Sequence, residues 1–204
     1  LITFILITGM LSMKKTRITN QINFLNEIDK LKAIDRATVL GDKSRRENSA
    51  EHSWHVTLFA LIFSEHAGKE VDLFKAIKML LIHDIVEIDA GDNPIFGNYD
   101  TNSLYESEQK AAKRIFGILP EDQAEEMLDI WNEFEDSYTP TAKFAKAMDR
   151  FQAPNQNLMS GGGTWVEYQV NYDQVKKKVG SKIALGAPKL WEWLKPHLKD
   201  FFKS

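Results

Sequence analysis

The chain has 204 residues, of which 43% are hydrophobic, and it carries a formal net charge of -3. This length suits one well-packed domain and is short for two domains with separate cores. The slight acidic excess argues against a partner that is a nucleic-acid polymer, since proteins that bind phosphate backbones concentrate Lys and Arg. The sequence has no cysteine, so disulfides and thiolate metal sites are excluded and any metal must be bound by nitrogen and oxygen.

The chain opens on an apolar segment, LITFILITGMLS. This segment is shorter than the ~20 residues that span a bilayer, and it lacks the basic start of a secretory signal. We therefore expect no membrane association and a cytoplasmic protein, with a weak export signal as the alternative. Because Met13-Lys14-Lys15 resembles a more ordinary start, residues 1–13 are interpreted as an extension and residues 14–204 as the folded domain.

Helical periodicity dominates the rest of the sequence. Apolar residues recur at intervals of three and four, and alternating stretches rich in β-branched residues are scarce, so the predicted fold is all-α, a single compact helical bundle. The first predicted helix has an apolar stripe over residues 24–34. The second opens on a capping box formed by Asn48 and Glu51 and runs to about Ala67. The third, residues 72–90, is apolar on nearly all sides, which predicts a central position.

The second half of the sequence also predicts helices. They are expected at residues 103–116, from residue 121, from residue 140, and over the closing segment 190–201, which we expect to dock on the domain or contact a second copy. Thr139 and Pro140 supply an N-cap and a first-turn proline to the helix that carries Asp149, and apolar neighbours predict that Asp149 borders packed surface. Residues 161–163 are three glycines without the Lys-Ser or Lys-Thr of a phosphate-binding loop, and we interpret them as a turn or lid.

Ionisable residues interrupt the most apolar of these segments. His83 and Asp84 lie within the run KMLLIHDIVEID. A buried imidazole and carboxylate need partners, and one divalent cation satisfies both. His52 and Asp149, on two other predicted helices, could complete the site, although His55 competes with His52 on spacing alone. Because adjacent helical residues diverge by about 100°, the two neighbours can bind one ion only where their faces meet.

The order His, His-Asp, Asp resembles the HD-domain superfamily of metal-dependent phosphohydrolases. The segments RRENSAEHSWH and LIHDIVEIDAGD look like its 5′-deoxynucleotidase-related branch, and the likeness covers roughly residues 20–193. The resemblance implies that one divalent metal ion is held by His52, His83, Asp84 and Asp149, and that His55 is a packed neighbour. A mixed nitrogen and oxygen site suits manganese, cobalt, iron, nickel or zinc.

The resemblance also implies a homodimeric enzyme that releases phosphate from nucleoside 5′-monophosphates, with deoxyribonucleotides as the expected substrates. Glu87 and Asp92 match catalytic residues of related enzymes, and Arg36 matches a phosphate-binding arginine. In this interpretation the metal activates water, and Glu87 or Asp92 protonates the leaving oxygen or positions the nucleophile. Characterised deoxynucleotidases follow the arginine with tryptophan where this chain has Ala37, so their nucleotide preferences are not carried over.

Each of these assignments has a structural alternative. His83 and Asp84 could be a buried hydrogen-bonded pair, Asp149 could pair with Arg150, and Glu87 could be a surface residue. Two alternatives also stay open for the function. One is hydrolysis of another phosphoester or a phosphoanhydride, and the other is a non-catalytic nucleotide sensor that retains the metal site.

Overall fold

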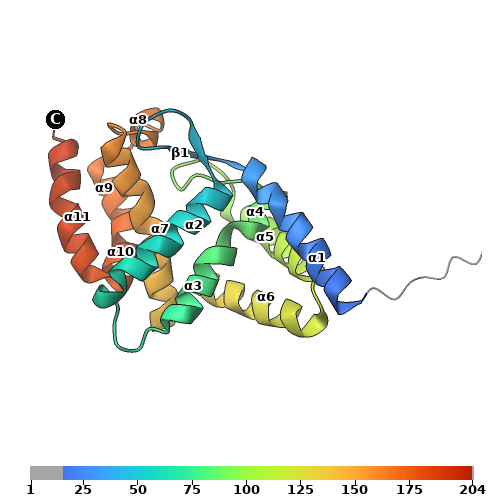
Figure 1. Ribbon diagram of the computed structural model, residues 1–204. Coiled ribbons are helices and arrows are strands. Elements are labelled where there is room, and N and C mark those ends of the chain that lie inside the picture. The colour runs from blue at the N-terminus through green and yellow to red at the C-terminus, as the bar shows by residue number, and fades with distance from the viewer. Residues whose placement is uncertain (1–15, 204) are drawn as a thin grey trace, which may run out of the picture.

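A computed structural model describes residues 16–203, and the predicted extension, residues 1–13, lies outside them (Figure 1). Helix α1, Arg17–Ile28, begins after Thr16, whose hydroxyl accepts a hydrogen bond from the backbone amide of Thr19. The helix then tightens into a 3₁₀ turn, Asp29–Ala33. The first predicted helix is therefore correct in place, but its last residues are not α-helical.

A small hairpin follows that the sequence did not predict. Strand β1, Asp35–Val39, pairs antiparallel with β2, Arg46–Asn48. Asp35 lies opposite Asn48 and Val39 opposite Arg46, so the longer strand contains a bulge. Bulges bend a strand and re-aim its side chains. Arg36 lies within this irregular stretch, and its side chain is 13% exposed.

Helix α2, Ser49–Ile62, begins with the predicted capping box. Asn48 Oδ1 accepts from the Glu51 amide at 2.9 Å, and Glu51 Oε1 accepts from the Asn48 amide at 2.8 Å. The helix ends earlier than predicted, because residues Phe63–His66 form a 3₁₀ turn. The capping box fixes where α2 starts and hence the position of His52 one turn later.

The third predicted helix is broken into three pieces. They are α3, Leu73–Ile82, a 3₁₀ turn, His83–Val86, and α4, Glu87–Ala90. Trp131 Nε1 donates to the backbone oxygen of His83 at 3.0 Å, and the Glu87 amide bonds to the carbonyls of Asp84 and Ile85. The carbonyl that would continue an α-helix is thus taken by an indole from another helix. The break falls at the His-Asp pair itself.

Helix α3 is not enclosed on every side, contrary to the prediction. Met79 and Leu80 are fully buried, but Phe74 is 69% exposed and Leu81 is 49% exposed. The apolar composition of α3 therefore does not mean that the helix is buried on every side.

The second half of the chain is helical, as predicted. Its elements are α5, Thr101–Phe116; α6, Glu121–Asp136; α7, Pro140–Met159; α8, Thr164–Glu167; α9, Tyr172–Val175; a π-helical turn, Lys176–Gly180; α10, Ser181–Gly186; and α11, Pro188–Phe201. Thr139 Oγ1 caps α7 by accepting from the Ala142 amide at 3.1 Å. The three glycines after α7 all have positive φ, which residues with a side chain rarely adopt, so they form a sharp turn.

Helices α2, α3 and α7 pack on one another at the centre of the molecule. Helices α10 and α11 cover α7 on one side, whereas α6 packs against α3 and α7 on the other (Figure 1). The all-α prediction is confirmed, with one short hairpin added. None of the helices in the described residues is long and apolar enough to cross a membrane.

Gly186, at the end of α10, approaches the backbone of α7 closely. A Cβ there would overlap the Lys143 carbonyl oxygen and the Ala147 side chain. Gly186→Ala should therefore lower the free energy of unfolding by about 3 kcal/mol, measured by urea denaturation. Gly68→Ala is the matched control, since a Cβ at that position meets no described heavy atom within 4 Å. Equal stability of the two variants would contradict this packing.

Candidate metal centre

Side chains from three separate elements converge at the centre of the fold. His52 comes from α2, His83 from the 3₁₀ turn and Asp149 from α7, and one ligand atom from each lies within 4.8 Å of the others. Asp149 Oδ1 is 3.2 Å from His52 Nε2 and 3.7 Å from His83 Nε2. All three residues are buried.

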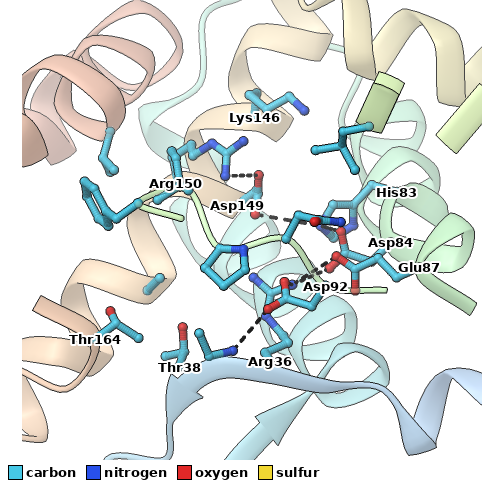
Figure 2. A pocket seen from close by; sticks show the side chains of 18 of the residues that line it. Arg36, Thr38, His83, Asp84, Glu87, Asp92, Lys146, Asp149, Arg150 and Thr164 are labelled. Carbon is cyan, nitrogen blue, oxygen red and sulfur yellow. Dashed lines mark hydrogen bonds and ion pairs between the residues drawn. The ribbon is translucent and has the colours of Figure 1, made fainter. Parts of the chain in front are cut away.

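Asp84 joins the same cluster. Its Oδ1 lies 3.1 Å from His83 Nε2, and its Oδ2 lies 3.8 Å from His52 Nε2. Figure 2 shows His83, Asp84 and Asp149 directed toward a common space. The structure therefore brings together all four residues predicted as ligands, including the two sequence neighbours whose convergence is geometrically demanding. His55 lies outside this group, with Nδ1 3.3 Å from Gln152 Nε2.

The hydrogen bonding of the His83 ring is typical of a metal ligand. Its Nδ1 lies 2.9 Å from the backbone oxygen of Leu80, an acceptor that places the ring proton on Nδ1. Its Nε2 then carries a lone pair, and this buried atom has no hydrogen-bond partner within residues 16–203. Metal-bound histidines characteristically donate their other ring N–H to such an acceptor. The donor set of imidazole nitrogens and carboxylate oxygens suits a divalent transition metal.

Negative charge is concentrated beside this cluster. Four carboxylates lie within 4 Å of the Arg36 guanidinium in the described structure: Asp84 at 2.7 Å, Glu47 at 3.5 Å, and Glu87 and Asp92 at 3.7 Å. Figure 2 shows three of them, Asp84, Glu87 and Asp92, around the end of Arg36. One guanidinium cannot neutralise them all, so the site favours further positive charge.

The protonation of His52 reflects the same excess of negative charge. Burial and the charge of Arg36 lower the pKa of His52, but the neighbouring carboxylates of Asp149, Glu47 and Asp84 outweigh them and raise it to about 9. The pKa of Asp149 lies well below its usual range, because Arg150, His52 and His83 outweigh the opposing effect of burial. A proton on His52 therefore occupies the place that a cation would otherwise fill.

Glu87 and Asp92 are held near the cluster by different contacts. Glu87 is 9% exposed, and its Oε2 accepts from the Ser49 hydroxyl at 2.5 Å. Burial, followed by Asp84, raises the pKa of Glu87 well above its usual value. Asp92 Oδ2 accepts from the backbone amide of Ala37 at 3.1 Å, which ties the residue to β1. Burial also raises the pKa of Asp92.

A cavity of about 300 Å³ opens onto these residues. Its lining includes Arg36 and the carboxylates, together with the apolar and aromatic residues Pro94, Ile95, Phe96, Tyr99, Trp165 and Tyr168. Sequence reasoning missed two further cations on this lining, Lys146 and Arg150, which lie on α7 on either side of Asp149 (Figure 2). The sequence suggests Arg150 only as a partner of Asp149, and its Nη1 does lie 3.7 Å from Asp149 Oδ2. The sequence does contain a hint of their location, because Lys146 lies three residues before Asp149 and Arg150 one residue after it.

Glu108 on α5 also lines the cavity and gives a pH-dependent prediction. Burial and Glu135 raise its pKa to about 7, against the lowering effect of Lys146. Because the unfolded chain loses this proton at lower pH than the folded one, stability falls as pH rises from about 4.5 to about 7.

In metal-stripped protein, Glu108→Gln should match the wild type near pH 4 and exceed its free energy of unfolding at pH 8. The increase in the free energy of unfolding at pH 8 should be only on the order of 1 kcal/mol, because solvent screens the charge of this partly exposed residue. Urea denaturation at the two pH values measures it. An equal effect of the substitution at both pH values would refute the raised pKa.

Comparison with known proteins agrees with this geometry. A family model described as HD domain matches residues 28–191. A solved structure from Magnetospirillum magnetotacticum MS-1, described as a predicted metal-dependent phosphohydrolase, is 43% identical with a TM-score of 0.86, covering 92% of this chain and 96% of its own. A protein from Pyrococcus horikoshii OT3 shares the fold at 19% identity and a TM-score of 0.63, covering 86% and 99%.

Curated relatives are more distant in sequence. The 5′-deoxynucleotidase HDDC2 of Bos taurus is 28% identical over 133 residues, which are 64% of this chain and 63% of that protein. Its counterpart in Dictyostelium discoideum is 28% identical over 140 residues, covering 66% and 74%. The match thus spans less than two thirds of the bovine relative. Since the family model covers most of the sequence, the chain belongs to the HD domain family.

Proposed function

We propose that this protein is a metal-dependent phosphomonoesterase that releases phosphate from nucleoside 5′-monophosphates, with deoxyribonucleotides preferred. The observation that carries the proposal is the buried Nε2 of His83, which makes no well-aligned hydrogen bond in the described chain and faces oxygens of Asp84 and Asp149 beside His52. The descriptions of the relatives, a metal-dependent phosphohydrolase and 5′-deoxynucleotidases, support the reaction class and the substrate class.

In this proposal His52, His83, Asp84 and Asp149 hold one divalent ion. The chemistry that such an ion supplies when bound is Lewis-acid activation of water and of the phosphoryl group. Manganese, cobalt, iron, nickel and zinc all suit the donor set. The 3₁₀ turn is what allows His83 and Asp84 to serve the same ion from adjacent positions.

Arg36 is the proposed phosphate-binding residue. Its side chain lines the cavity and donates to Asp84 Oδ2 at 2.7 Å through Nη1. A phosphate oxygen would replace that carboxylate as the acceptor and form a charge-assisted hydrogen bond. The buried guanidinium stays charged at all working pH values, because the surrounding carboxylates raise its pKa despite the opposing effect of burial.

Glu87 and Asp92 receive different roles. The leaving 5′-oxygen needs a proton, and Glu87 retains one to higher pH than an ordinary glutamate because of its burial beside Asp84. We assign proton donation to Glu87. Asp92 accepts from the Ala37 amide and lies 3.7 Å from Arg36 Nη1, so we assign it the positioning of β1 and the guanidinium.

The cavity fits the size and chemistry of a nucleotide. Its volume of about 300 Å³ is at the small end of the range for ligand sites. Among the lining residues, Arg36 suits a phosphate, and the aromatic residues Phe96, Tyr99 and Tyr168 suit a sugar and base. Homodimer formation and a cytoplasmic location stay predictions from the resemblance and the sequence.

Asp84→Ala should abolish activity in a phosphate-release screen. Metal-stripped protein is resupplied with one cation at a time and offered ribo- and deoxyribonucleoside 5′-monophosphates. Wild type should release orthophosphate, whereas the variant should lose about 10³-fold or more of its turnover and retain a helical circular dichroism spectrum.

Asp89→Ala is the matched control, since Asp89 lies close in sequence but pairs with Arg114 outside the cavity lining. Retained activity of Asp84→Ala would reject its assignment. Nucleotide binding by the wild type without phosphate release under every cation would instead favour a sensor, and release of pyrophosphate from triphosphates would point to another substrate.

Arg36→Ala should raise the KM for the preferred monophosphate about 10- to 100-fold, because each lost charge-assisted hydrogen bond costs about 1.5–3 kcal/mol. Steady-state kinetics at saturating metal measure this effect. The matched control is Arg45→Ala in the same hairpin, where Arg45 pairs with Glu51 at the surface. An unchanged KM for Arg36→Ala would remove the proposed phosphate clamp.

A further inference from the structure

Glu47 is a buried carboxylate without a role in the proposed reaction. It lies in β2 and is 1% exposed. A carboxylate in such a position costs several kcal/mol unless it is paired and hydrogen-bonded. Its surroundings therefore indicate what retains it there.

The two oxygens of Glu47 face different groups. Oε1 accepts from Gln152 Nε2 at 2.7 Å, and Gln156 Nε2 lies 3.5 Å from the same oxygen. Oε2 lies 3.4 Å from His52 Nδ1 and 3.5 Å from Arg36 Nε. One carboxylate thus lies between a proposed metal ligand and the proposed phosphate clamp.

Gln152 connects Glu47 to the histidine by a second route. Because its Nε2 donates to Glu47, its Oε1 is turned toward His52 and lies 3.2 Å from Nδ1. Both acceptors near His52 Nδ1, the Glu47 oxygen and the Gln152 oxygen, therefore favour a proton on that nitrogen. A neutral His52 then presents its lone pair at Nε2, the atom that faces Asp149.

Arg36 depends on Glu47 in a different way. Its Nε is buried and has no hydrogen-bond partner of good geometry in the described chain, and the same is true of Glu47 Oε2. The 3.5 Å approach of these two atoms is the electrostatic contact available to that side of the guanidinium. The Nη1 side of the guanidinium is available to bind Asp84 or a phosphate.

We propose that Glu47 is a positioning residue that sets the tautomer of His52, directly and through Gln152, and the orientation of Arg36. A single carboxylate in the hairpin would then place both a metal ligand and the phosphate-binding group. The Arg36 half rests on the proposed function, whereas the His52 half concerns metal binding alone. The two can be tested separately.

Glu47→Gln keeps the shape of the side chain and removes its charge. Isothermal titration calorimetry of metal-stripped protein with Mn²⁺ should show a Kd about 10- to 100-fold higher than in the wild type, the usual effect of losing a group that orients a metal ligand. The KM for the preferred monophosphate should rise severalfold at saturating metal. A Mn²⁺ Kd within about twofold of the wild type would overturn the His52 half, and an unchanged KM would overturn the Arg36 half.

The matched control is Glu51→Gln, the same substitution in the first turn of α2. Glu51 caps that helix and pairs with Arg45. Glutamine can still accept from the Asn48 amide and keep the start of α2, so this variant should weaken the pairing with Arg45 without changing the Mn²⁺ Kd. If Glu51→Gln weakens Mn²⁺ binding as much as Glu47→Gln, then a general loss of structure explains both and the proposal fails.

A measurement on the wild type makes the test independent of folding in the variant. Nitrogen-15 NMR of the histidine side chains in metal-stripped protein at alkaline pH, where no metal fixes the tautomer, reports which ring nitrogen of neutral His52 carries the proton. The proposal requires a protonated Nδ1, and a protonated Nε2 would overturn it. Neither this readout nor the Mn²⁺ titration depends on turnover, so failure of the phosphatase assignment would leave both interpretable.

Discussion

The concentration of buried negative charge around one point constrains the rest of this structure. Carboxylates approach the Arg36 guanidinium from β2, the 3₁₀ turn, α4 and the loop after α4. Such a group of acids is unstable in a protein interior unless cations neutralise it. The guanidinium, the raised pKa values of Glu87 and His52, and the proposed divalent ion are all consequences of this requirement.

The helix break at His83 is the local feature that makes the cluster possible. Trp131 reaches from α6 to bind the His83 carbonyl, and the following residues tighten into a 3₁₀ turn. His83 and Asp84 then bring Nε2 and Oδ1 to within 3.1 Å of each other. The mid-helix 3₁₀ segment therefore lies at the proposed functional centre, as such segments often do.

The hairpin ties the proposed substrate side of the site to its metal side. Its bulged strand carries Arg36 and offers the Ala37 amide to Asp92, while its short strand carries Glu47. Glu47 and Gln152 continue this link to His52 at the centre of the bundle. The short sheet contributes little to the core, but it places three groups that helices alone do not supply here.

The sequence alone determined the helical fold class, the capping box at Asn48 and the start of α7, because local periodicity and cap chemistry carry that information within a few turns of helix. The choice of the four proposed ligands rests on the family resemblance, since spacing alone does not separate His52 from His55. Tertiary structure decided the break at His83, the hairpin, and the placement of Glu47, Lys146 and Arg150 around the site. The break depends on an indole 48 residues away, and the burial of Glu47 depends on Gln152, 105 residues away. Neither partner can be read from a local pattern, because only the packed chain brings them together.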